Sequence, residues 1–504
     1  MKDYKALQNG SDIRGVAIEV PGGKPVNLSL DAVSDLTYGF AIWLSKKLGK
    51  KESALTFAVG RDSRVSGPDI EKCVTETLVL MGANVIDCGM ATTPSMFMTT
   101  VYDEVKADGS IMITASHLPM ERNGLKFFTK EGGLDKPDIK ALVELAENVP
   151  KEIGSTAGAG TKKSFDLLSL YAEKTRNLIC KELNEEESSL PLKNLKIAVD
   201  AGNGASGFYA KEVLEKLGAD VSGSQYLDPD GTFPNHQPNP ENEEAMESIC
   251  KAVWASKSDL GIIFDTDGDR SAAVDENGKE IARNRIVALA SVIASENHPG
   301  TTIVTDSITS TQLKDFLTGP LGLNHLRFKR GYKNVINKGL ELNSQGTDCQ
   351  LAIETSGHAA MKENYFLDDG AFLATKIVIK CAKLKKEGKS ISMLLEDLED
   401  PKEAKELRFN VNCDDFSNYA EEVLTALKDG VEAGKFAGLS LELPNYEGVR
   451  VNVDKAHGDG WFLLRKSLHD PVMPLNIESN IDGGVEKIYN ILEPFINHFD
   501  KLSI

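Results

Sequence analysis

A strand–loop–helix–strand pattern that occurs three times constrains the fold of this 504-residue chain more than any other feature. The first copy has an apolar run at 55–60, a polar loop, a helical pattern at 70–81 and a second apolar run at 84–88. Such a unit is the building block of a parallel α/β sheet. The other copies span 195–222 and 301–329. The sequence therefore predicts three similar α/β domains.

Within the second copy we expect strands at 195–200 and 219–222 on either side of a helix at 209–217. The third copy predicts a helix at 311–317 and a closing strand at 325–329. Both patterns have the strand and helix lengths that are usual in α/β proteins.

Length and local composition predict where these domains end. A chain of this length is too long for a single hydrophobic core. Small and polar residues precede position 165, Pro299 marks a second boundary, and a run of charges surrounds position 402. We therefore expect four domains, at 1–165, 166–298, 299–402 and 403–504.

Overall composition excludes several classes of function. The formal net charge of −19 argues against nucleic acid as a partner, because phosphates require basic surfaces. No apolar run is long enough for a membrane span, and the polar N-terminus predicts no signal peptide. The seven scattered cysteines fit neither a zinc site nor a disulfide framework. A cytoplasmic protein is the resulting expectation.

The most informative single stretch is Gly109–Phe128, GSIMITASHLPMERNGLKFF. Its apolar start fits a buried strand, and a polar turn is expected at 121–124, because Asn-Gly is a strong turn signal. The stretch presents the Ser116 hydroxyl at a strand end, with His117 beside it and Lys126 ten residues later. Serine is a nucleophile only where its surroundings activate it. On spacing alone, Ser116 is therefore better explained as a turn hydroxyl than as a catalyst.

A second stretch, Asp259–Glu276, places three carboxylates directly after an apolar run. Asp265, Asp267 and Asp269 alternate along the chain, and oxygen ligands of this kind suit Mg²⁺ or Ca²⁺. Without a cation, three acids after a buried strand would repel one another. The spacing therefore predicts a metal site.

Two loops also match signatures of other protein classes. The acidic loop has the spacing of an EF-hand, with Glu276 at its twelfth position, but Arg270 stands where that loop needs glycine. The loop Gly202–Gly207 satisfies G-x-G-x-x-G, and Asp228 lies where a dinucleotide fold places its ribose-binding acid. A single match of this kind is weak, so a structural turn is the favoured interpretation.

Together, the serine and acidic stretches resemble two loops of the α-D-phosphohexomutase family, the phosphoglucomutases and phosphomannomutases. TASHLPMERNGLKFF is similar to that family's phosphoserine loop, and DTDGDR is similar to its magnesium loop. LAIETSGHA resembles its sugar-binding loop, and RKSLHDP resembles its phosphate-binding loop, in the expected order. The resemblance implies three similar α/β domains with mixed sheets and a smaller α+β C-terminal domain around a central cleft.

The resemblance also implies which residues carry the chemistry. A phosphorylated Ser116 would share one Mg²⁺ with Asp265, Asp267 and Asp269. Positive charge for the phosphoryl group would come from basic residues around the serine, and His358 would be the base, with Lys126 as the alternative. The implied catalytic residues are Ser116, His117, Lys126, Arg14, Arg270 and His358.

Substrate recognition is expected from three further segments. Glu354 and Ser356 are suited to bond two vicinal sugar hydroxyls. The stretch RFKRGYKNVINK resembles a sugar-phosphate loop, although a solvated basic face would have the same composition. The implied substrate-binding residues are Arg330, Tyr332, Lys333, Glu354, Ser356, His358, Arg465, Ser467 and His469.

The fourth loop departs from the family pattern R-x-S-G-T-x-P. Arg465, Ser467 and Pro471 match it, whereas Leu468 replaces the glycine and His469 replaces the threonine. A protonated His469 would donate a hydrogen bond in place of the lost hydroxyl. This loop is therefore the main sequence argument against full activity.

The resemblance implies a phosphohexomutase that interconverts hexose 1-phosphate and hexose 6-phosphate of glucose or mannose. Its cofactors would be Mg²⁺ and a hexose 1,6-bisphosphate that is both activator and intermediate. We expect a phosphorylated hexose as partner and a monomer or dimer. The altered fourth loop leaves open a non-catalytic or regulatory phosphosugar-binding homologue. A metal-dependent phosphatase or a dehydrogenase explains fewer of the four loops.

Overall fold

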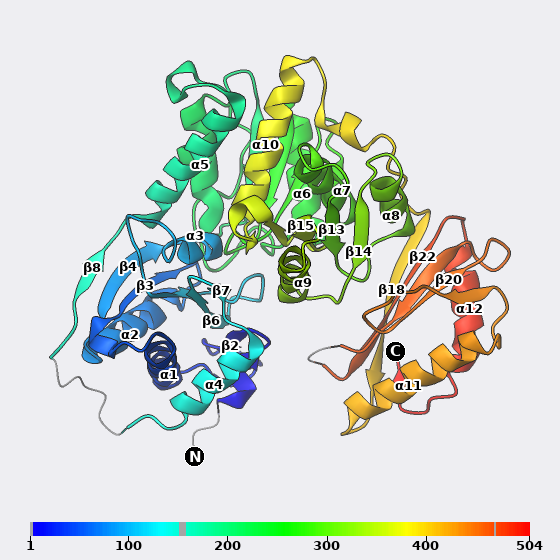
Figure 1. Ribbon diagram of the computed structural model, residues 1–504, viewed down its shortest axis with the longest axis horizontal. Helices are drawn as coiled ribbons and strands as arrows, with labels where there is room; N and C mark the ends of the chain where they lie inside the picture. The colour runs from blue at the N-terminus through cyan, green and yellow to red at the C-terminus, as the bar shows by residue number, and fades with distance from the viewer. Residues whose placement is uncertain (1–3, 151–157, 468–469) are drawn as a thin grey trace. The chain divides into compact units, whose positions relative to one another are not determined.

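The computed structural model describes residues 4–150, 158–467 and 470–504 (Figure 1). The chain divides into two compact units. Unit 1 comprises residues 1–286 and 356–393, and unit 2 comprises residues 287–355 and 394–504.

A mixed sheet at the start of unit 1 carries the serine stretch. The strands β3, β4, β5 and β8 are parallel, whereas β1, β2, β6 and β7 run antiparallel to their neighbours. The order along the sheet is β1-β2-β6-β5-β3-β4-β8, with β7 paired to β6. The bounds are β1 Gln8–Asn9, β2 Asp12–Val16, β3 Thr56–Arg61, β4 Asn84–Met90, β5 Gly109–Ile113, β6 Arg122–Thr129, β7 Gly132–Gly133 and β8 Lys162–Ser164.

One face of this sheet is covered by the helices α1 (Leu30–Leu48), α2 (Gly67–Leu80) and α4 (Lys136–Ala146). Helix α1 begins where the Ser29 side chain accepts the N–H of Ala32, and it ends at Gly49 in the left-handed conformation. Its buried side chains recur with helical spacing and join the core of the sheet. The short helix α3 (Thr93–Met98) has a capping box at Thr92 and Ser95.

A second mixed sheet in unit 1 carries the acidic stretch. Its order is β12-β11-β10-β9, in which only β9 and β10 are parallel. Helix α10 packs on β10 and β11 and beside α5. The bounds are β9 Ile197–Asp200, β10 Leu260–Phe264, β11 Ser271–Val274, β12 Glu280–Ile281, α5 Leu167–Leu183, α6 Glu243–Ser256 and α10 Gly370–Lys386. The strands β16 (Ala359–Met361) and β17 (Leu367–Asp368) pair antiparallel in the same unit.

Two elements of the second predicted repeat differ from the prediction. The strand expected at 219–222 is a turn with a single bridge from Asp220 to Lys196, because the Asp220 carboxylate accepts the N–H of Ser222 at 2.9 Å. The helix expected before it is a π-helix at Tyr209–Leu214 followed by a 3-10 turn at Glu215–Leu217.

The polar turn expected at 121–124 lies earlier in the chain. The N–H of Arg122 bonds the carbonyl of Pro119 at 3.0 Å, which closes the turn there. Residues 122–124 already belong to β6, because β2 supplies partners for them, including Arg14 opposite Gly124.

Unit 2 contains the third predicted repeat. Strand β13 lies between β14 and β15, and all three are parallel. Helices α8 and α9 connect them in the way the sequence predicts for an α/β unit. The bounds are β13 Thr302–Thr305, β14 Asn324–Arg327, β15 Cys349–Ile353, α8 Thr311–Thr318 and α9 Tyr332–Ser344; α7 spans Asn284–Ser295.

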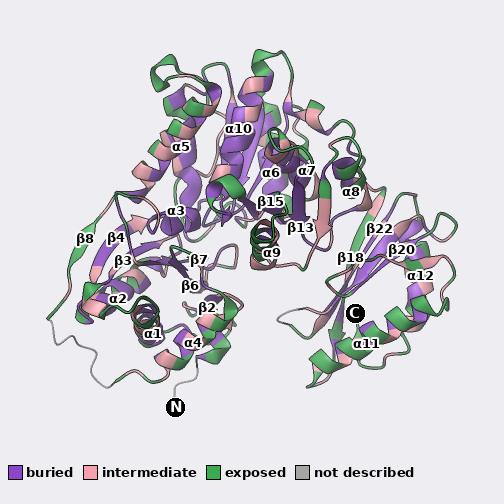
Figure 2. Cartoon of the chain, in the orientation of Figure 1, coloured by how far each residue is buried: buried purple, intermediate pink, exposed green. Residues whose placement is uncertain are grey.

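The last hundred residues form an antiparallel sheet with two helices. The strand order is β19-β20-β21-β22-β18-β23, and α11 and α12 bury their apolar sides against it (Figure 2). The bounds are β18 Glu403–Val411, β19 Leu439–Leu441, β20 Val449–Val453, β21 Gly460–Leu464, β22 Val472–Ser479, β23 Leu502–Ser503, α11 Phe416–Glu432 and α12 Gly484–Ile496.

Short 3-10 turns complete the chain, at Lys5–Leu7, Glu52–Ala54, Glu187–Ser189, Ala205–Gly207, Lys362–Asn364 and Ile391–Leu395. The seven cysteines are free thiols. Over the described ranges, we find no helix with the length and apolar character that crossing a membrane requires.

Candidate active site

The Ser116 loop begins where β5 ends, and it holds the serine in an unusual backbone conformation. Ser116 has a φ of 51° and is only 2% exposed. Its N–H donates to Thr114 Oγ1 at 2.8 Å. Its Oγ lies 3.2 Å from Asp265 Oδ2 and 3.3 Å from His117 Nδ1. The structure therefore brings the two predicted loops together at this hydroxyl.

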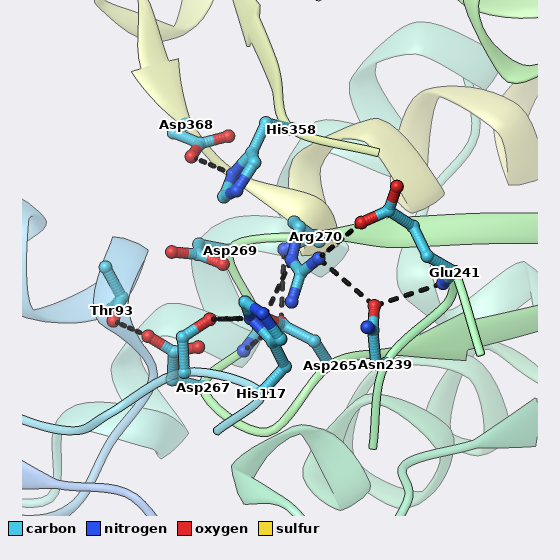
Figure 3. Close-up of polar contacts among 12 residues, drawn as sticks. Thr93, His117, Asn239, Glu241, Asp265, Asp267, Asp269, Arg270, His358 and Asp368 are labelled. Carbon is cyan, nitrogen blue, oxygen red and sulfur yellow. Dashed lines mark hydrogen bonds and ion pairs between the residues drawn. The ribbon is translucent and has the colours of Figure 1, made fainter. Parts of the chain in front are cut away.

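The acidic loop follows β10 and gathers three buried carboxylates (Figure 3). Asp265 Oδ1 accepts the N–H groups of Gly268 at 3.0 Å and Arg270 at 3.2 Å, which turns the loop back toward β11. Oxygens of Asp265, Asp267 and Asp269 lie within 4.8 Å of one another. Glu276, the twelfth residue from Asp265, instead accepts a hydrogen bond from Ser392.

These carboxylates fit a divalent cation. Asp267 Oδ1 and Asp269 Oδ1 are buried and have no hydrogen-bond partner within the described ranges, a condition that costs free energy unless a ligand satisfies them. Burial raises the pKa of Asp265 well above its ordinary value, and the charges of Asp269 and Asp267 raise it further. A hard cation with oxygen ligands, such as Mg²⁺, would satisfy both free oxygens and remove the repulsion.

Lys126 holds the acidic loop through ion pairs with two of its carboxylates. Lys126 Nζ, from β6, lies 2.5 Å from Asp269 Oδ2 and 3.3 Å from Asp267 Oδ2. Burial opposes ionisation of Asp269, but Lys126, with His358 and Arg270, outweighs it and lowers the pKa of that carboxyl. The predicted site residues Lys126 and Asp269 thus form a buried ion pair.

Arg270 is 1% exposed and directs one free donor into the site. Its Nε lies 3.1 Å from Asp265 Oδ2, and its Nη1 donates to Asn239 Oδ1 at 3.1 Å and lies 3.6 Å from Glu241. Its Nη2 is buried without a hydrogen-bond partner. A guanidinium fixed in this way offers an N–H to a phosphate oxygen.

The two histidines of the site differ in charge. Burial lowers the pKa of His117 to about 2, and the charges of Arg270 and Arg14 add to the effect. His358 is partly buried, which lowers its pKa, but its ion pair with Asp368 outweighs this effect and raises the pKa to about 9. His358 is therefore an imidazolium at neutral pH, which disfavours the role of base that the sequence suggested.

Arg14 lies on β2, opposite Gly124 of the serine-bearing hairpin. Its guanidinium contacts Asp12 at 3.0 Å, and the side chain is 15% exposed. This position places its charge close enough to lower the pKa of His117.

The glycine-rich loop that resembles a dinucleotide signature supports the acidic loop instead. A Cβ on Gly204 would lie 2.5 Å from the carbonyl oxygen of Thr266, and one on Gly207 would lie 1.9 Å from that of Leu227. The glycines are therefore required by backbone packing. The side chain of Asp228 is 95% exposed, which is unlike a ribose-binding acid in a pocket.

In unit 2, the predicted sugar loop and basic loop lie against each other. Glu354 Oε1 accepts the N–H of Gly331 at 2.6 Å, at the start of α9, where Tyr332 and Lys333 follow. The N–H of Arg330 donates to Glu447 at 3.1 Å, and its Nε lies 3.7 Å from the buried Asp306. Ser356, in unit 1, has a buried hydroxyl without a partner.

The altered fourth loop follows β21. Arg465 is 8% exposed, and no described residue hydrogen-bonds its buried Nε. Burial lowers the pKa of Arg465, and the charge of Arg330 lowers it further. Ser467 Oγ accepts the N–H of Asp470 at 3.3 Å. The predicted residue His469 lies outside the described residues.

Several residues at the site were missed by sequence reasoning. Each meets its partner only after folding, and none carries a local pattern that would have distinguished it. Thr93 donates to Asp267 through its hydroxyl, and through its N–H at 2.8 Å to the Asp267 carbonyl. The others are Arg64, Asp306, Asp368 and Glu447.

Sequence models of three phosphoglucomutase/phosphomannomutase α/β/α domains match this chain. Domain I matches residues 5–152, domain II residues 170–278 and domain III residues 282–401. A phosphomannomutase/phosphoglucomutase from Pseudomonas aeruginosa is 30% identical over 471 residues, which cover 92% of this chain and 93% of the relative. A probable phosphoglucosamine mutase from Methanosphaera stadtmanae is 29% identical over 99% of this chain and all of the relative.

A solved structure has a similar fold. A phosphoglucomutase/phosphomannomutase family protein from Burkholderia thailandensis matches with a TM-score of 0.77 at 26% identity, covering 97% of this chain and 96% of that one. Three α/β/α domains with mixed sheets and a further domain rich in β-strands are thereby confirmed.

Proposed function

Because the chain belongs to the phosphoglucomutase/phosphomannomutase family of isomerases, we propose that it moves a phosphoryl group between C1 and C6 of a hexose. The observation that carries this proposal is the set of buried polar atoms without partners around Ser116. Two are carboxylate oxygens, on Asp267 and Asp269, and one is the Arg270 donor. Such a set matches a cation beside a phosphoryl group.

In the proposed reaction, phospho-Ser116 transfers its phosphoryl group to the free hydroxyl of a hexose monophosphate. The P–O bond to Ser116 Oγ breaks, a P–O bond to the sugar forms, and the hydroxyl proton ends on Ser116. The product is a hexose 1,6-bisphosphate. After this intermediate turns over, its other phosphoryl group returns to Ser116, and the isomeric monophosphate leaves.

The residues of unit 1 are assigned by their positions. Lys126 and His358 are each held by carboxylates, so we assign both as cations that balance phosphoryl charge. Arg270 Nη2 donates to a phosphoryl oxygen, and Arg14 adds charge beside His117. Ser116, Asp265, Asp267 and Asp269 would hold Mg²⁺, which polarises the phosphoryl group when bound.

The residues of unit 2 are assigned to the distal part of the substrate. Glu354 bonds a sugar hydroxyl, while Arg465 and Ser467 bind the non-reacting phosphate. The hydroxyl of Ser356, which belongs to unit 1, is assigned to a second sugar hydroxyl. Tyr332 and Lys333 begin α9 and Arg330 lies two residues before it, at a helix start where backbone N–H groups also favour an anion. Arg465 Nε, buried without a partner, supports the assignment of a phosphate to this region.

The first test is phosphorylation of Ser116. We expect intact-mass spectrometry to find one added phosphoryl group after incubation with glucose 1,6-bisphosphate and Mg²⁺, because the serine is the acceptor in the return step. Ser116→Ala should lack this adduct and should not convert glucose 1-phosphate to glucose 6-phosphate in a coupled assay. Saturable binding of hexose phosphate without adduct or turnover would instead support a non-catalytic homologue.

The second test is substrate preference. We expect glucose 1-phosphate and mannose 1-phosphate to have a kcat/KM about tenfold or more above that of glucosamine 1-phosphate, a difference of ~1.4 kcal/mol. The loop E-T-S-G-H suits vicinal hydroxyls, and the nearby Arg330 and Arg465 would repel an ammonium group. Side-by-side assays measure this, and a preference for glucosamine 1-phosphate would contradict it.

A further inference from the structure

We propose that Arg64 is a positioning residue that holds the Ser116 loop in the conformation that phosphoryl transfer needs. The inference rests on the proposed function of Ser116. Arg64 lies in the polar loop between β3 and α2, and none of its surface is exposed. An arginine fully removed from water is costly unless its donors are satisfied, so its partners indicate its role.

The partners are the backbone carbonyls of the turn that follows Ser116. Nη2 of Arg64 donates to the carbonyls of Ser116 and, at 2.6 Å, Leu118. Nη1 donates to the carbonyls of Pro119 at 2.8 Å and Arg122 at 3.0 Å. The four terminal N–H groups of one planar fork therefore bond four acceptors of a single turn. The turn cannot shift without losing several of these bonds at once.

The other side of Arg64 is fixed by Asp62. Arg64 Nε lies 3.3 Å from Asp62 Oδ2, and both side chains are 0% exposed. Asp62 Oδ1 accepts the backbone N–H of Arg64 at 3.0 Å. The N–H of Asp62 bonds the carbonyl of Ile113 at 3.1 Å, at the end of β5. The guanidinium is thus anchored to the strand that carries the serine.

The segment 228–240, DPDGTFPNHQPNP, belongs to the part of unit 1 that contains the second mixed sheet, and it packs against the Arg64 loop. The Phe233 ring lies 5.4 Å from the Arg64 guanidinium. A Cβ on Gly231 would lie 2.3 Å from the carbonyl oxygen of Ser63, so this segment touches the Arg64 loop directly. Gln237 Nε2 donates to the carbonyl of His117 at 3.0 Å. Side-chain donors therefore hold the carbonyls of both Ser116 and His117.

The bonds from Arg64 and Gln237 to carbonyls of the Ser116 turn form a clamp. This clamp explains how Ser116 remains in a left-handed conformation. For a residue with a side chain, that conformation is unfavourable unless other contacts hold it. The bond from Arg64 to the Ser116 carbonyl fixes the peptide plane, while Oγ lies 3.2 Å from Asp265. A serine that must give and take a phosphoryl group in line depends on this placement, because an error of about 1 Å can cost ~100-fold in rate.

The test is Arg64→Lys, which keeps the charge but replaces the fork with one nitrogen. We expect kcat to fall about 100-fold with KM within about twofold, because the loop moves while the substrate contacts remain. Arg61→Lys is the matched control: it lies at the end of β3 and pairs with Glu71 at 3.0 Å, and we expect near-normal kcat. A raised KM with unchanged kcat, or wild-type kinetics, in Arg64→Lys would overturn the proposal.

Two further measurements keep the proposal separable from the function of Ser116. Amide hydrogen exchange at 115–122 should be faster in Arg64→Lys than in wild type, and it can be read even in a protein without mutase activity. If Arg64→Lys does not fold, Gln237→Ala provides the alternative test, because Gln237 is exposed and its loss should not prevent folding. For this variant we expect a loss of about fivefold in kcat and faster amide hydrogen exchange at 117–119. Unchanged exchange and kcat in Gln237→Ala would then overturn the clamp.

Discussion

Asp267→Asn is expected to abolish measurable turnover while the fold stays intact. Asp267 is fully buried, and its Oδ2 already accepts hydrogen bonds from Thr93 and Lys126. The Oδ1 atom has no partner and is available to a cation. An amide keeps the shape of the carboxylate but loses its charge, so Mg²⁺ would be held by two carboxylates instead of three. We expect kcat/KM to fall on the order of 10³-fold, as when a main electrostatic contact is removed.

The measurement is a coupled assay over a range of Mg²⁺ concentrations, with circular dichroism and thermal unfolding to monitor the fold. Asp275→Asn is the matched control, because Asp275 is also buried and follows the acidic loop, but its Oδ1 accepts N–H groups within its own turn. It should alter stability and leave kcat/KM within about twofold. Activity equal to wild type in a metal-stripped sample would contradict the metal assignment.

Local features of the fold were predictable from the sequence. The helix expected at 311–317 is α8 at Thr311–Thr318, and the apolar run at 55–60 is β3 at Thr56–Arg61. Both depend on periodicity within one segment. The three acids of the candidate metal site were identified for the same reason, because they lie close together in the sequence and follow an apolar run.

Partners that come from distant segments were not predictable. Thr93 meets Asp267, and Arg64 meets Ser116, only because strand ends of separate elements converge. The missing strand at 219–222 has a side-chain cause, since the Asp220 carboxylate takes a backbone N–H that a ladder would have used. The domain boundaries and the roles of the site residues stay predictions, because both depend on how distant segments of the chain pack together and not on the pattern within one segment.

The altered phosphate-binding loop gives the second large effect that we expect. Arg465 is nearly buried at the end of β21, where its N–H bonds the carbonyl of Pro474 at 3.1 Å. Among the residues that the structure describes, its Nε has no hydrogen-bond partner, which makes this N–H a candidate donor for a phosphate oxygen. A guanidinium bonds two phosphate oxygens at once, and such charge-assisted bonds are about twice as strong as neutral ones. The family threonine is absent here, which leaves more of the binding to Arg465.

Arg465→Ala should therefore cost on the order of 2–4 kcal/mol in kcat/KM, roughly 30- to 1000-fold. Arg408→Ala is the matched control, because Arg408 lies on the neighbouring β18, is 70% exposed and pairs with Glu406 at 2.7 Å. Exposed ion pairs contribute ~1 kcal/mol or less, so this control should stay within about threefold. Near-normal kinetics in Arg465→Ala would mean that the loop is an inert turn, and that the distal phosphate is bound instead by the Arg330 region at the start of α9.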